Sequence, residues 1–481
     1  KTRTTTKNIQ GVTMGKASRL FNGTAEQTLH SRITPTPEQR EFLQTQWNSL
    51  AEHLKAELAG WGYPISTWLQ GSYKYGTLIK PVHKGEEYDV DVGIYFSWDP
   101  KAVDVSPTAV QLRTWVQQEL LQYKSQNADV KHVEEPAKER CSRAVYAKQF
   151  HIDTPTYHLN SDTEVRRLAC LSGKWEDSDP KALYNWFKTA VGTDNRDLLR
   201  RLVRYLKGWA AVAFEEAPSS RPSSIVLTVL AAEAFQAMWG ARFLGIEDDD
   251  ALIAVVATIH KRLSADKRVA NPIDESEDLN RIADEDWDAF FTRLTLLQDA
   301  AQNANEAADE AAAALAWSDS FAFLMPLPET DEVEVLDHNS GRALMQIPDI
   351  EIQVFDVEGG KLLATYMNEV PDVERDRYMT FTIVNRHIVP DFAMVEWTVR
   401  NDGGDAVALG DLGHKRGGIG LLSVDEHTAY IGKHYMDCVI RCNGSVFSAR
   451  RVPVFIKAGA RPLLAQAKRS WTRLRTRRGR R

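Results

Sequence analysis

The period of the hydrophobic residues changes twice along the chain, and this restricts the folds that it can adopt. Up to about residue 165, segments with helical spacing alternate with segments that have strand-like alternation. From residue 180 to about 315 the helical period dominates. Beyond residue 335, short runs rich in Val, Ile, Thr, Tyr and Phe are separated by turn signals such as Asn401-Asp402-Gly403-Gly404. We therefore expect a multidomain α+β protein with a mixed first domain, a helical second domain and an all-β third domain.

Prolines and charges mark the boundaries between these parts. Pro326 and Pro328, followed by the acidic run from Glu329 to Glu334, predict a linker. The last 21 residues carry nine basic residues and no acidic one, which is typical of a solvated tail or of a segment that binds nucleic acid, a membrane surface or a partner protein. The expected parts are an N-terminal arm (1–34), a core domain (35–179), a helical domain (180–325), a β-sandwich (335–457) and a basic tail (461–481).

The composition is that of an ordinary globular protein. The 481 residues have a net charge of -7 and are 43% hydrophobic, which is enough to build sizeable cores. The four cysteines exclude a disulfide scaffold, and no apolar run approaches the roughly 18 residues of a membrane span. The first ten residues lack the apolar stretch of a signal peptide. These features predict a cytoplasmic protein without a transmembrane segment.

Two carboxylates lie side by side on a predicted strand. Asp89 and Asp91 project from one face of the segment Tyr88-Asp89-Val90-Asp91-Val92, while the valines project into the core. Such carboxylates repel each other, and one of them tends to bind a proton unless a hard divalent cation lies between them. Mg²⁺ uses one or two carboxylates and fills its other positions with water and phosphate oxygens. The pair therefore predicts a nucleoside triphosphate site that binds Mg²⁺, with Mn²⁺ as an alternative.

Two further segments fit such a site. Upstream, Gly71 permits a close approach of the backbone to a phosphate, and the Ser72 hydroxyl can bind its oxygens. Downstream, Asp153 follows the apolar run 144–152, which we expect to be one strand that Pro155 ends. If this strand lies beside the strand with the two aspartates, three carboxylates converge, as a two-metal phosphoryl-transfer site requires.

These residues together carry a family resemblance. The segments Gln70-Gly71-Ser72-Tyr73 and Glu87-Tyr88-Asp89-Val90-Asp91-Val92-Gly93 resemble the polymerase-β-like nucleotidyltransferases, and more narrowly the bacterial cGAS/DncV-like nucleotidyltransferases (CD-NTases) of anti-phage signalling (CBASS). The segments 397–403 and 430–435 are similar to the adenylyl/guanylyl cyclase and SMODS-associated C-terminal sensor domain of some of these enzymes. The similarities extend over most of residues 35–457.

The resemblance implies a polymerase-β-like nucleotidyltransferase core, a helical domain that closes one side of an NTP cleft, and a C-terminal all-β sandwich. Asp89 and Asp91 would hold the metal on the triphosphate, and Asp153 would join them around the metal that activates an acceptor hydroxyl. The residues implied in nucleotide binding are Gly71, Ser72, Lys207, Ser223 and Ser224.

The resemblance also implies an activity and partners. The enzyme would join NTPs, ATP foremost, into a cyclic di- or oligonucleotide messenger and release pyrophosphate. A separate effector would respond to the messenger during phage infection, and the C-terminal domain would have a nucleotide as its ligand. Two alternatives stay open. One is a nucleotidyltransferase that makes a linear product, deoxynucleotides included, or that modifies a protein or an RNA. The other is a non-catalytic nucleotide-sensing regulator.

The nucleotide-binding assignments in the helical domain have simple structural alternatives. Lys207 could extend along an amphipathic helix towards solvent, as lysines commonly do. Ser223 and Ser224 could cap the helix that begins near Ile225, and a helix N-terminus is at the same time an anion site.

Two other features of the sequence could supply ligands, but we expect them to have structural roles. His434, Cys438 and Cys442 have the composition of a zinc site, but we expect the two cysteines to lie on a buried strand face as small hydrophobic residues. His151 is expected to support its neighbours or the fold, because a general base is not required where metals deprotonate the hydroxyl.

Overall fold

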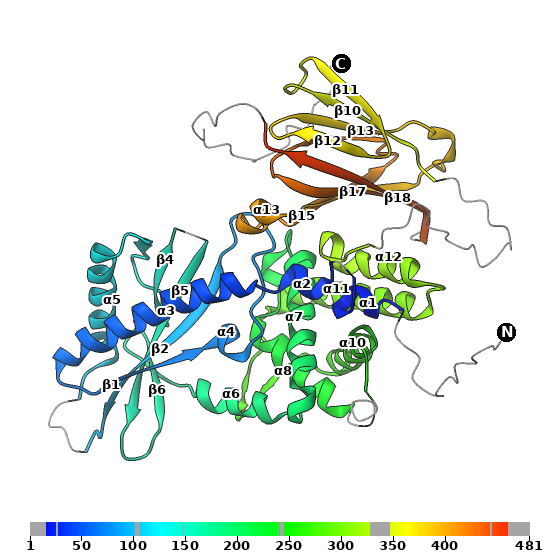
Figure 1. Ribbon diagram of the computed structural model, residues 1–481. Helices are drawn as coiled ribbons and strands as arrows, with labels where there is room; N and C mark the ends of the chain where they lie inside the picture. Colours follow the sequence, from blue (N-terminus) through cyan, green and yellow to red (C-terminus); the bar gives the residue numbers. More distant parts are fainter. Residues whose placement is uncertain are drawn as a thin grey trace, which may run out of the picture.

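The computed structural model describes residues 16–25, 27–101, 106–147, 149–238, 240, 245–327, 347–442 and 445–459. Figure 1 shows three units: a sheet with two long helices in blue and cyan, a group of helices in green, and two facing sheets in yellow and red. The predicted basic tail and most of the predicted linker lie outside the described residues. No helix in the described part of the chain has both the length and the apolar character needed to cross a membrane.

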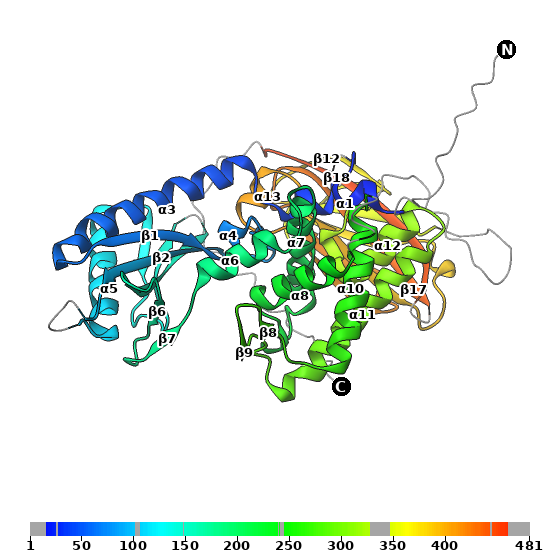
Figure 2. The same cartoon turned by 90° about the horizontal axis from the view of Figure 1, so that it is seen from below.

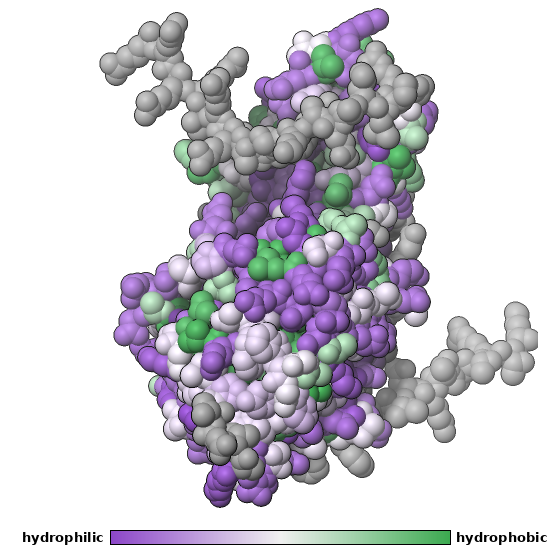
Figure 3. Space-filling view, turned by 90° about the vertical axis from the view of Figure 1, so that its left-hand side faces the viewer, coloured by the Kyte–Doolittle hydropathy of each residue, from purple (hydrophilic) through white to green (hydrophobic). Residues whose placement is uncertain are grey.

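A mixed sheet forms the core domain. Its strands follow the order β1-β2-β5-β4-β3, and β6 and β7 extend it beyond β5. The long helices α3 (Pro37–Leu58) and α5 (Ala109–Gln126) bury their apolar faces together with the valines of β2. The strands are β1 (Ile65–Gln70), β2 (Tyr88–Trp98), β3 (Val130–Val133), β4 (Cys141–Tyr146), β5 (Phe150–Asn160), β6 (Arg166–Ala169) and β7 (Trp175–Asp177). The outer face of this domain is mostly hydrophilic, with only scattered hydrophobic residues (Figure 3).

The expected single strand over residues 144–152 is wrong. The chain forms a hairpin there, because β4 and β5 run antiparallel and are joined by a turn that contains Gln149. Asp153 consequently lies inside β5, and Pro155 does not end the strand. The pairing of β2 with β5 is interrupted between the pairs Asp91–Asp153 and Ile94–Thr156. A proline, which has no N–H to donate, is tolerated at such an interruption.

The helical domain surrounds the long helix α7 (Arg196–Ala213). Its other helices are α6 (Pro180–Thr189), α8 (Ser224–Ala237), α10 (Asp248–Ala265), α11 (Asp284–Glu306) and α12 (Glu310–Phe321), and a small hairpin is formed by β8 (Ala270–Asn271) and β9 (Asp274–Asp278). Two short N-terminal helices, α1 (Ser18–Asn22) and α2 (Leu29–Ile33), bury Phe21 and Ile33 in the same hydrophobic core. From Ala17 onwards the segment predicted as an N-terminal arm is therefore part of the helical domain.

Two sheets form the C-terminal domain, and their facing sides enclose one hydrophobic core. This confirms the predicted sandwich. One sheet has the order β11-β10-β13-β16, and the other β12-β18-β17-β14-β15. The elements are β10 (Ile350–Phe355), β11 (Leu362–Met367), β12 (Val370–Glu374), β13 (Tyr378–Ile383), β14 (Met394–Arg400), α13 (Gly404–Ala408), β15 (Gly413–Ile419), β16 (Ser423–His427), β17 (Gly432–Cys442) and β18 (Ser445–Lys457). Met436, Cys438 and Ile440 are all buried in this core, as the alternation of β17 predicts.

Figure 2 shows the molecule from below, where α4 (Gly71–Tyr75) lies between the core sheet and helices α7 and α8.

Candidate active site

Strands β2 and β5 bring the three predicted carboxylates together. In their parallel register Asp91 faces Asp153, and Asp89 faces His151. One ligand atom from each of Asp89, His151 and Asp153 lies within 4.8 Å of the others, so among the described residues these three form a group that could hold a metal ion. Asp91 is not a member of this group, and the strand register places it opposite Asp153.

His151 bridges two carboxylates. Its Nδ1 lies 2.9 Å from Oε2 of Glu87, and its Nε2 lies 2.9 Å from Oδ1 of Asp89. Burial acts to lower the pKa of His151, but the hydrogen bonds and charge of these carboxylates outweigh it and raise the pKa above its usual value. For Asp89, burial acts to raise the pKa, and the contact with His151 overcomes this effect and lowers it. The contact between His151 and Asp89 thus raises the pKa of the histidine and lowers the pKa of the aspartate.

Arg143 holds Asp153. The two residues face each other across the β4–β5 pair, and the Nε and Nη2 groups of Arg143 donate to the two carboxylate oxygens at 2.6 and 2.7 Å. The thiol of Cys141 is a third partner at 3.3 Å. Asp153 is buried, and a buried carboxylate requires such a cationic partner. Sequence reasoning missed Arg143 because it did not find the hairpin, whose register places position 143 opposite position 153.

Within the described residues no cationic side chain donates a hydrogen bond to Asp91, and the carboxylates of Asp89 and Asp153 make its environment negative. Burial and the charges of Asp89 and Asp153 raise the pKa of Asp91 to about 8. Its carboxylate also packs against α4: a Cβ added to Gly71 would lie 1.9 Å from Oδ2 of Asp91, and Gly71 has a φ of +59°. A glycine is therefore required at position 71 both for space and for backbone conformation.

The carboxylates open into a pocket between the core and helical domains. The pocket has a volume of about 220 Å³. Its lining combines the phosphate-binding candidates with the two aspartates of β2: Gly71, Ser72, Tyr75, Thr77, Asp89, Asp91, Lys207, Ser224, Ile225 and Thr228. The sequence also pointed to Thr77, which belongs to the Gly76-Thr77 part of the family motif, but it did not identify Tyr75 and Thr228 as lining residues, because they belong to ordinary packing patterns.

Of the three nucleotide-binding candidates in the helical domain, two line the pocket and one does not. Lys207 is buried, its Nζ donates to the Thr77 carbonyl at 3.0 Å, and burial lowers its pKa to about 8, so it does not extend into solvent. Ser224 lines the pocket, but Ser223 is not among the lining residues. Ser223 occupies the N-cap position of α8, although its hydroxyl makes no capping hydrogen bond.

The donor set suits a hard divalent cation. Three carboxylates converge, and one of them has a pKa raised by its negative neighbours, so the site is short of positive charge. Both ring nitrogens of His151 already contact carboxylates, which makes His151 a holder of Asp89 rather than a free ligand. Of the three predicted carboxylates, Asp89 and Asp153 have ligand atoms within 4.8 Å of each other, and Asp91 lines the adjoining pocket together with Asp89.

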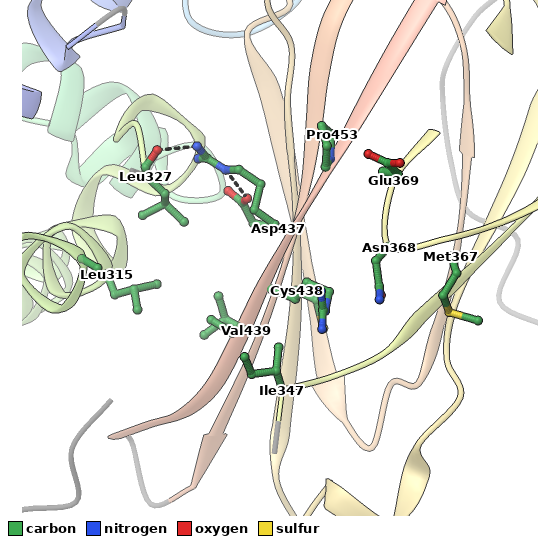
Figure 4. A pocket seen from close by; sticks show the side chains of 14 residues that line it. Leu315, Leu327, Ile347, Met367, Asn368, Glu369, Asp437, Cys438, Val439 and Pro453 are labelled. Atoms are coloured by element: carbon green, nitrogen blue, oxygen red, sulfur yellow. Dashed lines mark hydrogen bonds and ion pairs between the residues drawn. The ribbon is translucent and has the colours of Figure 1, made fainter. Parts of the chain in front are cut away.

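A second cavity, of about 260 Å³, lies where the sandwich meets α12 (Figure 4). Leu315 and Leu327 form its apolar side, and residues of β17 and β18 form the opposite side. Arg451 connects the two sides, because its guanidinium donates both to the Leu327 carbonyl and to Asp437. This cavity belongs to the domain interface and lacks the convergent carboxylates of the first pocket.

Two protein families match separate parts of the chain. Residues 65–157 match the nucleotidyltransferase domain of the family described as cyclic GMP-AMP synthase DncV-like. Residues 334–457 match the adenylyl/guanylyl and SMODS C-terminal sensor domain. The first match contains β2 and residues 150–157 of β5, and hence all three aspartates.

Relatives and solved structures agree with these matches. A cyclic GMP-AMP synthase of Escherichia albertii is 29% identical over 434 residues, which cover 90% of this chain and 94% of the relative. A c-di-GMP synthase of Roseivirga ehrenbergii is 24% identical over 259 residues, 45% of this chain and 63% of that protein. The crystal structure of the Vibrio cholerae DncV cyclic AMP-GMP synthase shares the fold, with a TM-score of 0.52 and 19% identity, over 65% of this chain and 98% of that one. The chain therefore contains a segment that matches the DncV-like nucleotidyltransferase domain and a C-terminal segment that matches the sensor domain, and over 90% of its length it is similar to a cyclic GMP-AMP synthase.

Proposed function

We propose that this chain is an Mg²⁺-dependent synthase that joins NTPs into a cyclic di- or oligonucleotide and releases pyrophosphate. The observation that carries the proposal is the convergence of Asp89, Asp91 and Asp153 beside a pocket that contains Gly71 and Lys207. Relatives named as cyclic GMP-AMP synthase and c-di-GMP synthase support a cyclic product. A Vibrio cholerae neighbour in the same fold has been solved in complex with the linear intermediate 5' pppA(3',5')pG, which supports a stepwise reaction.

Different residues around the pocket bind the phosphates and the metal ions. The hydroxyl of Ser72 and the backbone next to Gly71 bind phosphate oxygens, and Lys207 supplies a positive charge to the triphosphate. Asp89 and Asp91 would hold Mg²⁺ on the triphosphate, and together with Asp153 they would hold Mg²⁺ at the acceptor. When bound, Mg²⁺ supplies charge neutralisation and lowers the pKa of the acceptor hydroxyl. The acceptor hydroxyl would release its proton to solvent, its oxygen would form a bond to the α-phosphorus, and the bond from that phosphorus to pyrophosphate would break.

Two basic side chains orient the carboxylates before the substrate binds. His151 fixes Oδ1 of Asp89, and Arg143 fixes both oxygens of Asp153. Each carboxylate oxygen keeps a further lone pair for a metal ion. The side chains are thus oriented in advance, which lowers the cost of assembling the site around the nucleotide.

Nucleotide feeding tests the proposed reaction. The protein is incubated with Mg²⁺ and mixtures of labelled NTPs, and products are analysed by mass and by resistance to phosphatase. A phosphatase-resistant product of cyclic mass is expected, and Asp89→Ala should abolish it because the substitution removes a metal-binding carboxylate. Asp177→Ala, which changes an exposed aspartate of β7, should leave the yield unchanged. Absence of any nucleotide product from all mixtures would contradict the proposal.

The same experiment separates the two alternatives. A linear product has a free terminal phosphate and loses it to phosphatase, and a modified protein or RNA appears as a mass shift of that macromolecule. A non-catalytic regulator would bind nucleotide without releasing pyrophosphate, and Asp89→Ala would leave its function intact.

A role in anti-phage defence with a separate effector is part of the proposal. It follows from the family resemblance. A bacterial host that expresses the chain with its effector should resist phage, and the Asp89→Ala variant should not. Equal phage titres for the two strains would contradict this role.

A further inference from the structure

The segment between α4 and β2 connects two parts of the candidate active site. It comprises residues 76–87, which form no helix or strand. At its start Thr77 lines the pocket, and its carbonyl accepts the hydrogen bond from Lys207 Nζ at 3.0 Å. At its end Oε2 of Glu87 lies 2.9 Å from Nδ1 of His151, whose other ring nitrogen contacts a carboxylate of β2. The position of this segment therefore affects both the lysine of the pocket and the support of a carboxylate.

The middle of segment 76–87 contacts the C-terminal domain. Residues 401–412, which we call the sensor loop, include α13 and join β14 to β15. Gly410 of this loop lies against the segment: an added Cβ would be 3.1 Å from Cβ of Pro81 and 3.7 Å from the carbonyl oxygen of His83. Pro81 is buried. Figure 1 shows α13 between the sandwich and the core sheet, in agreement with this contact.

Two further contacts hold the sensor loop against the rest of the chain. The Leu409 carbonyl accepts a hydrogen bond at 3.2 Å from the side chain of Gln149, in the turn before β5. Leu412 is 2% exposed and belongs to the hydrophobic core of the helical domain, which also contains Val82 of segment 76–87. The sensor loop thus contacts the chain just before each of the two strands that carry the aspartates.

The helical domain holds segment 76–87 from the other side. Lys80 donates through its backbone N–H to the Ile33 carbonyl at 2.7 Å and through Nζ to the Ser31 carbonyl at 2.9 Å. Nε2 of His83 lies 3.0 Å from the Ala211 carbonyl oxygen. Because close-packed interiors transmit strain, a shift of the sensor loop is passed on to this segment.

We propose that the sensor loop is a positioning element of the nucleotide site. Its contact with Pro81 fixes segment 76–87, and the segment in turn fixes Lys207 at one end and His151 at the other. A ligand of the sandwich that moves β14 relative to β15 would move the sensor loop and thereby change the affinity for nucleotide. Gly410 and Pro81 act as positioning residues, since neither lines the pocket. The inference rests on the proposed function, because it concerns the regulation of the same site.

A matched pair of glycines isolates the contact. Gly410 and Gly420 both lie in the C-terminal domain and have φ values of +64° and +62°. A Cβ added to Gly410 meets Pro81, whereas a Cβ added to Gly420 meets nothing within 4 Å. Asparagine is among the residues that adopt a positive φ most readily. Gly410→Asn and Gly420→Asn therefore differ mainly in the bulk that they place against Pro81.

Nucleotide binding is measured without turnover on the full-length protein. Calorimetry in Mg²⁺ uses α,β-methylene ATP and α,β-methylene GTP, which cannot release pyrophosphate. We expect Gly410→Asn to weaken binding of the analogues about fivefold or more, the lower end of the range for coupling between sites. Gly420→Asn should bind them as the wild type does. Gln149→Ala, which removes the hydrogen bond to Leu409 without added bulk, should also weaken binding, and it tests the inference if Gly410→Asn does not fold.

Circular dichroism and the melting temperature establish which variants are folded. Unchanged analogue binding by a folded Gly410→Asn would overturn the inference, and so would an equal loss in Gly420→Asn. If Gly410→Asn does not fold, unchanged binding by Gln149→Ala has the same consequence. A wild type that binds the analogues but forms no product from NTPs contradicts the proposed synthase and leaves this inference standing, so the two failures are distinguishable.

Discussion

At the scale of single residues, the candidate active site depends on an arginine and a histidine that contact its carboxylates. Arg143 occupies both oxygens of the buried Asp153, and His151 connects Asp89 to Glu87. Groups that orient a metal ligand commonly contribute to metal affinity and rate although they do not touch the metal. We therefore treat Arg143 and His151 as positioning residues.

Arg143→Gln should raise the Mg²⁺ concentration required for half-maximal activity and lower the rate about 10- to 100-fold, the range typical for partners of metal ligands. The physical reason is that Asp153 loses two charge-assisted hydrogen bonds and with them its fixed orientation. Binding of Mn²⁺ to the nucleotide-free protein gives a readout independent of turnover. Arg140→Gln is the control, because Arg140 pairs with Glu176 at the surface. An unchanged Mg²⁺ dependence would contradict the positioning role.

Gly71→Ala should abolish activity while most of the fold persists. The new Cβ would overlap with Oδ2 of Asp91, and the φ of +59° costs a non-glycine residue about 1–2 kcal/mol. Activity and the free energy of unfolding are measured on the same preparation. Gly60→Ala is the matched control, since an added Cβ there meets nothing within 4 Å. An active Gly71→Ala variant would show that the tight contact is not required.

At the scale of elements, the period of two in β2 was enough to predict that Asp89 and Asp91 share a face, because alternation is a property of the strand itself. The β4–β5 hairpin was not predictable from the sequence. Its turn contains Gln149 at a φ of 56°, without a glycine or asparagine to indicate it. Contacts from elsewhere hold this turn: its carbonyl accepts from the Tyr88 N–H, and its side chain donates to the Leu409 carbonyl. A local sequence pattern does not indicate a turn that is held by contacts from distant segments.

The start of α8 gives a prediction with a built-in control. Ser224→Ala should raise the KM for NTP about 3- to 10-fold, which corresponds to one lost hydrogen bond, because Ser224 lines the pocket. Ser223→Ala should change neither KM nor stability appreciably, since its hydroxyl makes no capping bond. Initial rates over a range of NTP concentrations provide the test. Equal effects of the two substitutions would remove the distinction between these serines.

At the scale of the whole molecule, buried arginines join the sandwich to the helical domain. Arg400 of β14 pairs with Asp437 in the interior and donates to the carbonyls of Ala322 and Met325 after α12. Arg32 of α2 donates to the carbonyls of Phe323 and Leu412, so three distant segments meet there. The sequence predicted the domains but not this junction, because arginines whose partners are main-chain carbonyls have no sequence signature.

Arg400→Ala should lower the free energy of unfolding by about 3 kcal/mol, since it leaves Asp437 partly uncompensated in the interior. Chemical denaturation followed by tryptophan fluorescence measures the change, because Trp397 lies on the same strand. Lys457→Ala breaks the exposed ion pair with Asp372 and should cost less than about 1 kcal/mol. Similar losses for the two variants would show that the buried junction contributes no more than a surface pair.

The contact between Gln149 and Leu409 limits the modularity of the protein in evolution. Leu409 directly follows α13, which Figure 1 shows between the sandwich and the core sheet, and Gln149 lies two positions before His151. A sensor domain exchanged for another would have to present an equivalent carbonyl at this point, or the turn before β5 would keep only its hydrogen bond to Tyr88. An exchange of the sensor domain therefore also changes the contacts of a turn next to the candidate active site.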